Sequence, residues 1–206
     1  TVTVNETGTP SAGVDGTLTL CSSGASADLF SALGSGADAG GTWSGPSAVV
    51  GNSYDPATMT GGIYTYSIAA IAPCSGASAT VTVTENAAAS AGTNGTLTIC
   101  DAGTTVALVN SLGGTPQAGG AWSGPSAVVG GNYDPATMTA GVYTYTVTGA
   151  APCTNATATV TVNETGTPSA GVDGTLTLCS SGASADLFSA LGAGADPGGT
   201  WSGPSA

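Results

Sequence analysis

The chain has 206 residues, of which 41% are hydrophobic and 34 are glycine, and it contains no Lys, Arg or His. Its 12 acidic residues give a formal net charge of −12. Because no cationic side chain is available to neutralise phosphates, the composition excludes nucleic-acid binding, and an anionic membrane surface would repel the chain. No uninterrupted apolar stretch is long enough for a bilayer, so we expect no membrane-spanning segment.

The first part of the chain has the pattern of short strands separated by turns. Residues 17–20 (TLTL) alternate polar and apolar side chains, which predicts a half-buried strand. Residues 27–34 (ADLFSALG) predict a helical turn that Ser26 or Asp28 caps and that a glycine ends. Residues 42–44 (TWS) predict another strand, which a Gly-Pro turn follows.

More strands are expected in the next forty positions. Residues 48–50 (AVV) predict a short buried run, and the Tyr-Asp-Pro sequence from residue 54 predicts a turn. Along 62–68 (GIYTYSI), every second side chain from Tyr64 onward is expected on one face. Residues 80–83 (TVTV) predict a last strand with Val inside and Thr outside. Many short strands with closely spaced turns predict an all-β fold of the β-sandwich type.

The whole pattern repeats every 79 residues, as the positions of the three Trp residues show. Residues 1–48 and 159–206 differ only at positions 35/193 and 39/197, so two slightly different units alternate. The repeat predicts the final strand of a preceding unit at 1–4, β-sandwich units at 5–83 and 84–162, and the N-terminal part of a further unit at 163–206. We expect an extended rod of such units, cut from a longer array.

The cysteines recur with the same period. Cys21 and Cys74 are 53 residues apart, and Cys100 and Cys153 repeat this spacing. The spacing predicts one disulfide in each complete unit, with a partner for Cys179 outside the chain. Disulfides indicate an oxidising, extracellular compartment. Metal ligation is the alternative, and it is disfavoured because no second Cys lies nearby and no His is present.

Large aromatic residues also recur with the repeat, and we assign them to the core of each unit, because one Trp usually anchors a small domain. These core anchors are Trp43, Trp122, Trp201, Tyr64 and Tyr143. For the Trp side chains, a glycan-stacking platform is the alternative. Tyr64 is also placed to donate a tyrosine-corner hydrogen bond to backbone a few residues upstream.

For the acidic residues we weigh calcium binding against plain surface charge. Calcium takes several oxygen ligands, which acids near the unit junctions could supply. The candidate ligands are Glu6, Asp15, Glu85, Glu164 and Asp173. The chain has no D-x-D-x-D run, so solvated charge that keeps chains apart and soluble is favoured. Apart from this candidate calcium, the sequence predicts no cofactor.

Catalysis is not predicted. With every Cys expected in a disulfide, only carboxylates and hydroxyls remain for acid–base or nucleophilic chemistry. Asp15 and Asp173 lie in the sequence GVDGT, where the other unit has Asn94. A catalytic carboxylate would not tolerate this change, whereas an Asp-Gly or Asn-Gly hairpin turn would. We therefore expect no enzymatic activity.

The order of motifs resembles the tandem repeats of very large surface adhesins of Bacteroidota, including gliding-motility adhesins exported by type IX secretion. The matching stretches are DLFSALG at 28–34, GGTWSGPSA at 40–48, YDPATMTGGIYTY at 54–66, APC at 72–74 and ATVTVT at 79–84. The resemblance implies immunoglobulin-like or PKD-like modules joined into a filament at the cell surface. Neighbouring repeats, or copies of the same filament, are the partners that it implies.

Two functions from different classes follow. The leading hypothesis is a structural or adhesive region of a long extracellular filament or adhesin stalk, with a role in surface attachment or gliding. The alternative is a carbohydrate- or surface-binding repeat module, which calcium would stiffen. An exposed flat face of Thr would favour the alternative, and Thr-x-Thr ladders occur at 80–82 and 159–161.

Overall fold

The computed structural model describes residues 1–204 and is mainly β-sheet, with three short 3-10 helices. We call β1 to β6 the first unit, β7 to β12 the second unit, and residues 166–204 the third segment. The elements of the first unit are β1 (Gly16–Cys21), β2 (Ala27–Asp28), η1 (Phe30–Leu33), β3 (Thr42–Ser44), β4 (Ser53–Tyr54), β5 (Gly62–Ile68) and β6 (Ala77–Asn86). Those of the second unit are β7 (Gly95–Cys100), β8 (Val106–Ala107), η2 (Leu108–Ser111), β9 (Ala121–Ser123), β10 (Asn132–Tyr133), β11 (Gly141–Val147) and β12 (Ala156–Thr165).

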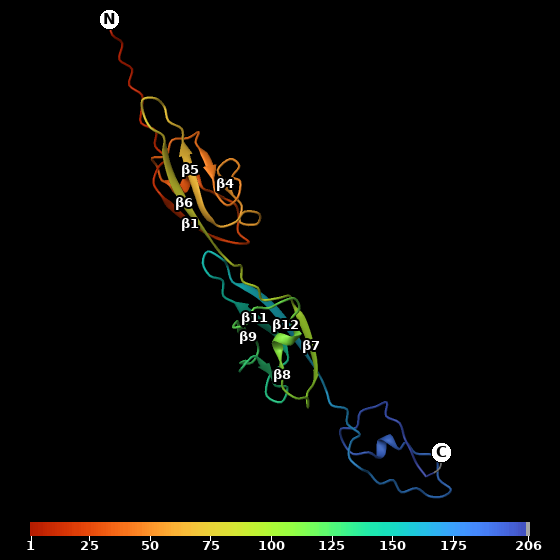
Figure 1. Cartoon of the computed structure of the whole chain (residues 1–206). Coiled ribbons are helices and arrows are strands. Elements are labelled where there is room, and N and C mark those ends of the chain that lie inside the picture. Colours follow the sequence, from red (N-terminus) through yellow and green to blue (C-terminus); the bar gives the residue numbers. More distant parts are fainter. Residues whose placement is uncertain (205–206) are drawn as a thin grey trace.

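Each unit is a sandwich-like pair of sheets, as the all-β prediction requires. The larger sheet has the order β1-β6-β5-β3 in the first unit and β7-β12-β11-β9 in the second. A two-stranded sheet accompanies it, β2 with β4 or β8 with β10. In the larger sheet of the first unit, β5 is antiparallel to both of its neighbours, β6 and β3. Strand β1 runs parallel to β6, so the C-terminal ends of β1 and β6 lie at the same end of the sheet (Figure 1).

The strands form where the sequence alternates, because successive side chains of a strand point to opposite faces. Along β6, Ala79, Val81 and Val83 are buried, while the Thr residues between them face outward. Along β5, Tyr64 and Tyr66 are buried in the same way. The expected strands at 17–20, 62–68 and 80–83 are therefore confirmed.

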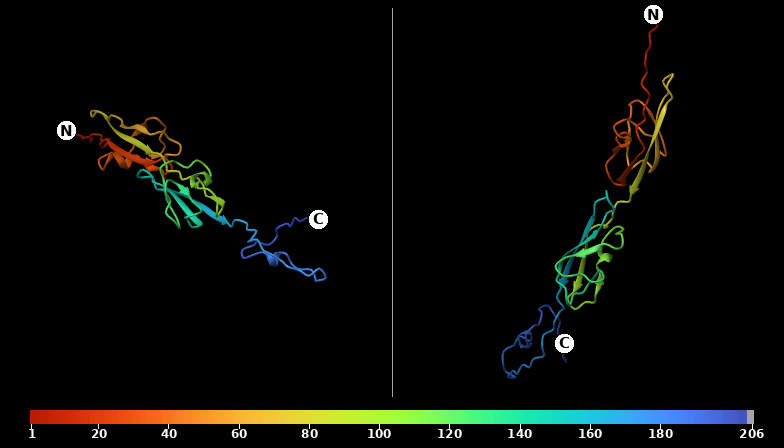
Figure 2. Two further views of the ribbon diagram at one scale, coloured as in Figure 1. Left: turned by 90° about the horizontal axis from the view of Figure 1, so that it is seen from below. Right: turned by 90° about the vertical axis from the view of Figure 1, so that its left-hand side faces the viewer.

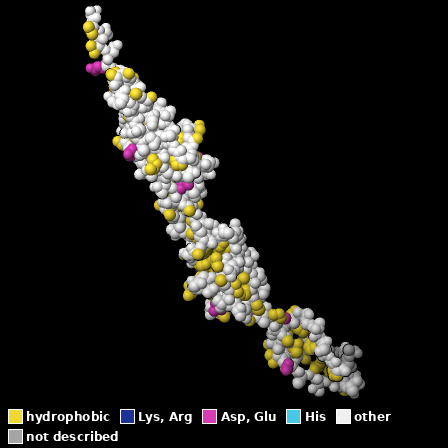
Figure 3. Space-filling view, viewed as in Figure 1, with side chains coloured by type: hydrophobic (Ala, Val, Ile, Leu, Met, Phe, Trp, Pro, Cys, Tyr) yellow, Lys and Arg dark blue, Asp and Glu magenta, His cyan; other side chains and the backbone are white. Residues whose placement is uncertain are grey.

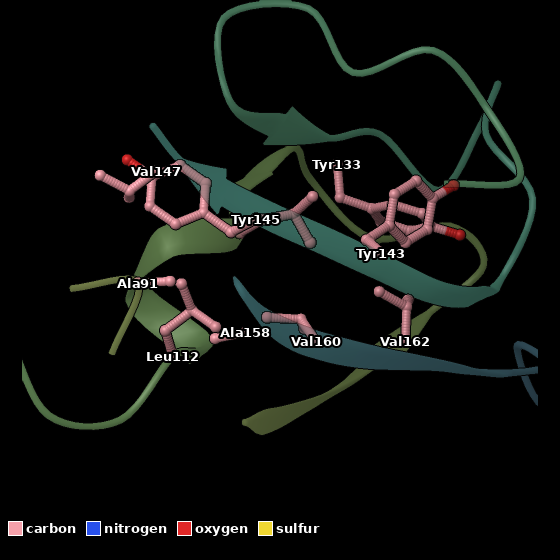
Figure 4. Close-up of a cluster of buried hydrophobic side chains, with 10 residues drawn as sticks. Ala91, Leu112, Tyr133, Tyr143, Tyr145, Val147, Ala158, Val160 and Val162 are labelled. Carbon is pink, nitrogen blue, oxygen red and sulfur yellow. The ribbon is translucent and has the colours of Figure 1, made fainter. Parts of the chain in front are cut away.

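The core of each unit is small and rich in Tyr. In the second unit, Tyr143 and Tyr145 of β11 lie beside Val160 and Ala158 of β12 on the buried face of the sheet, as Figure 4 shows. Tyr133 of β10 packs edge-on against Tyr143, with ring centroids 5.5 Å apart. The buried core of the second unit thus combines three Tyr rings with Ala, Leu and Val side chains, which suits a unit too small for a large aliphatic core.

The segments at 27–34 and 48–50 differ from the expected local structure. The helical turn is a 3-10 helix, η1, whose N-cap position is Leu29 and has no side-chain cap, so the expected caps at Ser26 and Asp28 are wrong. The carboxylate of Asp28, just before the helix, still accepts the backbone N–H of Phe30 at 2.9 Å. The predicted buried run at 48–50 is wrong, because Val50 is 82% exposed. Val49 alone packs against the core, because residues 48–50 form no strand: a bend precedes them at 45–47, and Val50 makes only an isolated bridge to Ser53.

In the two views of Figure 2 the first unit, the second unit and the third segment follow one another, with the chain ends far apart. The third segment has one 3-10 turn, η3 (Phe188–Ala190), and an isolated bridge between Ala170 and Ala195, but no strand within 166–204. Among the described residues, no helix combines the length and apolarity needed to cross a membrane.

Candidate functional site

The most distinctive feature of the molecule is a covalent bond between the two units. Cys21, the last residue of β1, forms a disulfide with Cys153, which precedes β12 of the second unit, and their Cα atoms are 4.9 Å apart. The predicted pairs Cys21–Cys74 and Cys100–Cys153 are therefore wrong. Cys74 and Cys100 form no disulfide within residues 1–204.

Strand direction explains why the predicted pairing fails. Because β1 is parallel to β6, Cys21 lies beside Asn86 at the C-terminal end of β6. Cys74 lies just before the other end of β6, which is 10 residues long. At a rise of about 3.3 Å per residue, a strand of this length holds the two thiols roughly 30 Å apart. The two cysteines that are 53 residues apart thus lie at opposite ends of one unit and cannot bond to each other.

Hydrogen bonds surround the disulfide and connect the same segments. The N–H of Ser22 donates to the carbonyl oxygen of Asn86 at 2.9 Å, and the Ser22 hydroxyl accepts the N–H of Ala88 at 3.1 Å. The Asn86 side-chain amide donates to the carbonyl oxygen of Ala151 at 2.6 Å. The Sγ of Cys153 lies 3.3 Å from the Asn86 carbonyl oxygen. Asn86 therefore contacts both the strand end of the first unit and the loop of the second.

The same arrangement recurs at the end of the second unit, with Asp101 in the place of Ser22. The N–H of Asp101 donates to the Thr165 carbonyl oxygen at 3.0 Å, and its carboxylate accepts the N–H of Thr167 at 3.0 Å. The Thr167 hydroxyl donates to the same carboxylate oxygen, and this bond in particular lowers the pKa of Asp101 below its ordinary value. A carboxylate that accepts several bonds favours its charged form.

The two tyrosine corners are present. The hydroxyl of Tyr64 donates to the carbonyl oxygen of Thr60 at 2.7 Å, and Tyr143 makes the same bond to Thr139 at 2.7 Å. Both Tyr side chains are fully buried. This bond fixes the chain at the start of β5 and of β11, as the tyrosine corner does in immunoglobulin domains.

The Trp residues lie at the edge of the core. Trp43 and Trp122 are half-buried and stack obliquely on Tyr66 and Tyr145, with ring centroids 5.0 and 4.9 Å apart. The indole N–H of Trp43 donates to the side chain of Asn52 at 2.9 Å. Trp201, in the third segment, is 56% exposed. Trp43 and Trp122 thus pack against the core of their units and keep part of their surface accessible, whereas Trp201 anchors no core within the described residues.

Of the acidic residues that were candidates for calcium, three serve as hydrogen-bond acceptors inside a unit. Asp15 accepts the N–H of Thr80 at 2.7 Å. Glu85 accepts the hydroxyl of Tyr54, and Glu164 accepts that of Tyr133 at 2.6 Å. Burial, together with the neighbouring carboxylate, raises the pKa of both Tyr hydroxyls above their ordinary value.

The structure does not gather these acids around a common point. In the β1–β6 register, Asp15 precedes Gly16 opposite Val81, and Glu85 lies opposite Leu20, which separates the two carboxylates by about five residues, or roughly 17 Å. Glu6 is exposed in the N-terminal segment, and Asp173 is exposed in the third segment. Within residues 1–204 no three Asp, Glu or Cys side chains come together in a way that could hold a metal ion.

The predicted hairpin turn at the GVDGT sequence is also wrong. Strand β1 starts at Gly16 directly after Asp15 and pairs in parallel with β6, a pairing that no hairpin can make. In the second unit the side-chain oxygen of Asn94 accepts the N–H of Thr159 at 2.9 Å. Asp and Asn can replace each other here because only an acceptor oxygen is needed.

The outer face of each four-stranded sheet carries mostly Thr and Ser. In the first unit, Thr17 of β1 lies beside Thr82 of β6, and Thr65 of β5 lies beside Thr80 of β6. In the second unit, the face contains Thr96, Thr98, Thr144, Thr146, Thr157, Thr159 and Thr161. Figure 3 shows a surface with few acidic side chains and large uncharged areas. The Thr-x-Thr ladders are visible in the sequence, but their position side by side depends on the pairing of the strands.

Comparison with models of known protein families gives no match, and comparison with curated proteins gives no significant relative.

Proposed function

We propose that the chain is a structural segment of a long extracellular filament or adhesin stalk, built from immunoglobulin-like units arranged as a rod. The observation that carries the proposal is the disulfide between Cys21 and Cys153, which joins consecutive units. A disulfide inside each unit would stabilise that unit alone. A disulfide between units constrains how one unit moves against the next, which is a property that a stalk requires.

Two covalent connections cross the junction. One is the main chain, which leaves the first unit at the end of β6 and has entered the core of the second unit by Ala91. The other is the disulfide at Cys21. A single flexible connection permits bending and twisting in all directions, whereas two connections side by side restrict both. The hydrogen bonds of Asn86 to both units add to this restriction.

Composition and compartment are consistent with this function. The net charge of −12, without any cation, favours repulsion between neighbouring filaments and keeps them soluble. The disulfide is compatible with an extracellular location, where such bonds persist. Neighbouring units, or copies of the same filament, are the partners that this function requires.

Small-angle X-ray scattering of the 206-residue chain tests the rod. The two units and the third segment, if each adds about 33 Å, the length of a ten-residue strand, give a rod of roughly 100 Å with a radius of gyration of about 30 Å. A compact domain of the same length has a radius of gyration of about 17 Å. A value near the compact one would contradict the proposal.

The contribution of the disulfide is tested with paired variants. Replacement of Cys21 and Cys153 by Ser removes the second connection, and we expect a broader distribution of inter-unit distances in the scattering data. Replacement of Cys74 and Cys100 by Ser leaves the Cys21–Cys153 bond in place and is the matched control. Equal flexibility in the two variants would show that the bond does not stiffen the junction.

A carbohydrate-binding role is the second candidate, and the outer Thr and Ser face of each large sheet favours it. Neighbouring strands place their Thr hydroxyls about 4.8 Å apart, and successive outward residues are about 6.7 Å apart. Such a regular array of hydroxyl and methyl groups suits an uncharged polysaccharide, which presents hydroxyls and apolar ring faces. The same face recurs in both units, so that weak contacts can add along a chain.

Binding to an insoluble uncharged polysaccharide, such as cellulose, tests this candidate. Replacement of Thr82 and Thr161 by Glu places a charge on the outer face of each unit and should reduce the bound fraction. Replacement of Val50 and Val129, which are 82% exposed on a loop, by Glu is the control with the same added charge. Equal binding by both variants would exclude the Thr face as the binding surface.

A further inference from the structure

Three cysteines form no disulfide within residues 1–204, namely Cys74, Cys100 and Cys179, and each occupies a position whose repeat equivalent, Cys21 or Cys153, forms the disulfide between units. Cys74 and Cys100 lie in the two complete units. Cys100 ends β7 as Cys21 ends β1, and Cys74 corresponds to Cys153 through the 79-residue repeat. Neither Cys74 nor Cys100 is in a disulfide within residues 1–204. We infer that Cys100 and Cys74 are complementary halves of a second junction, in which Cys100 of one pair of units bonds to Cys74 of another.

The surroundings of the two thiols match those of the bonded pair. The Sγ of Cys153 lies 3.3 Å from the carbonyl oxygen of Asn86, and the Sγ of Cys74 lies 3.7 Å from that of Thr7, which is 79 residues before Asn86. Cys100 lies opposite Thr165 of β12, as Cys21 lies opposite Asn86 of β6. Each thiol therefore has the backbone environment of its bonded equivalent.

Cys74 and Cys100 cannot bond to each other within one pair of units, because they lie at opposite ends of it. The Cys74 loop contacts Thr7 in the segment that enters the first unit. Cys100 contacts Thr167 in the segment that leaves the second unit (Figure 1). One pair of units thus has the Cys74 thiol at the end where the chain enters and the Cys100 thiol at the end where it leaves. This is the arrangement needed for head-to-tail joining.

The alternation of the units identifies which cysteine completes the bond. In the observed bond the two cysteines are 132 residues apart. With two alternating units and a repeat of 158 residues, the position 132 residues beyond Cys100 corresponds to Cys74. The partner of Cys100 is thus a cysteine in the context Ala-Pro-Cys-Ser-Gly, carried by a unit of the first kind. That unit belongs to the same polypeptide or to a second copy.

The bond forms by two thiol–disulfide exchanges with a disulfide donor such as oxidised glutathione. The thiolate of Cys100 attacks the donor and releases one reduced thiol. The thiolate of Cys74 then attacks the Cys100 sulfur of the mixed disulfide and releases the second. The two thiol protons end on the released thiols, and the donor gains the two electrons that the cysteines lose.

The consequence for a filament is that successive covalent loops interlock. Cys100 lies between Cys21 and Cys153 in the sequence, so the Cys100–Cys74 bond begins inside the loop that the Cys21–Cys153 bond closes. Reduction of one bond then leaves its neighbours to hold the adjacent units. The inference rests on the proposed stalk function, since it supplies the unit-to-unit connection that a stalk needs.

Non-reducing peptide mapping of the native material tests the inference. Free thiols are alkylated in denaturant without reductant, and the protein is cut with an acid-specific protease because trypsin has no site in this chain. We expect the Cys100 peptide linked to the Cys74 peptide, in at least about tenfold excess over Cys74–Cys74 and Cys100–Cys100 links, as about 1.4 kcal/mol of preferential docking would give. The Cys21–Cys153 link is the internal control.

Alkylated Cys74 and Cys100, or links between like cysteines as frequent as random pairing gives, would overturn the inference. Electrophoresis with and without reductant distinguishes the two sources of the partner. An unchanged polypeptide mass places the bond within one polypeptide, and a fall in mass on reduction places it between copies. Either result supports the bond. Alkylated thiols in a chain that scattering shows to be extended would refute this inference and leave the stalk proposal standing.

Discussion

The carboxylate of Asp15 accepts a 2.7 Å hydrogen bond from the backbone N–H of Thr80, 65 residues further along the chain. The bond ties the start of β1 to β6 before their parallel pairing begins. In the second unit Asn94 and Thr159 make the equivalent bond at 2.9 Å. One acceptor oxygen in each unit therefore sets where the edge strand starts along its neighbour.

Asp15→Asn is expected to change the free energy of unfolding by less than about 0.5 kcal/mol, since the second unit uses Asn at this place. Asp15→Ala removes the acceptor oxygen and should lower the free energy of unfolding by about 1 kcal/mol. The Thr80 amide should also exchange its hydrogen faster in the Ala variant. Asp173→Ala is the matched control, because no β6-type strand lies beside Asp173 within the described residues. Equal effects of Asp15→Ala and Asp173→Ala would count against the assigned role.

The tyrosine corner makes a separate prediction. Tyr64→Phe keeps the ring in the core but removes the hydroxyl that donates to the Thr60 carbonyl oxygen at 2.7 Å. We expect a loss of about 1 to 1.5 kcal/mol in the free energy of unfolding, measured by denaturant titration. Ile63→Val, at a position 59% exposed where the second unit has Val142, should stay within about 0.5 kcal/mol. An unaffected Tyr64→Phe variant would show that the corner bond is dispensable.

Alkaline pH should destabilise both units. The pKa values of Tyr54 and Tyr133 are raised in the folded chain, first by burial and then by the bonds to Glu85 and Glu164. In the unfolded chain a Tyr hydroxyl has a pKa of about 10. Above that pH the unfolded state binds fewer protons than the folded state, so stability falls as pH rises.

This prediction is checked by following the thermal midpoint between about pH 8 and about pH 12, a range that includes the ordinary Tyr pKa. The variant with both Tyr54 and Tyr133 replaced by Phe should be less stable near neutrality but should lose less stability across this range. Parallel curves for the variant and the unchanged chain would contradict the prediction, because they would assign the alkaline loss to other groups.

The success of sequence-based prediction differed between local and long-range features. Alternating residues at 62–68 and 80–83 placed their strands correctly, because a strand with one buried face needs only a period of two. The tyrosine corner at Tyr64 was also predicted, since donor and acceptor lie four residues apart. Strand alternation and the tyrosine corner both depend on residues that are close in the sequence, so a single sequence is enough to predict them.

The disulfide pairing could not be predicted from the spacing of cysteines. The separation of 53 residues occurs in both complete units, whereas the observed separation of 132 residues can occur only between units. Which cysteines pair depends on whether β1 runs parallel or antiparallel to β6. The alternation of polar and apolar residues does not indicate the direction of a strand relative to its neighbour. The bond from Tyr54 to Glu85 was missed for a similar reason, because it joins two strands from different sheets.

The disulfide between the two units is tested most directly by the extension of single molecules that are pulled from their two ends. With Cys21 bonded to Cys153, the force passes through the disulfide, and the residues between them cannot extend even when they unfold. Adding a reductant under load should then release one additional length of about 460 Å, at roughly 3.5 Å for each extended residue. Two separate releases of roughly 190 Å would indicate bonds inside the units. Two such shorter releases, or no release at all, would contradict a disulfide between consecutive units.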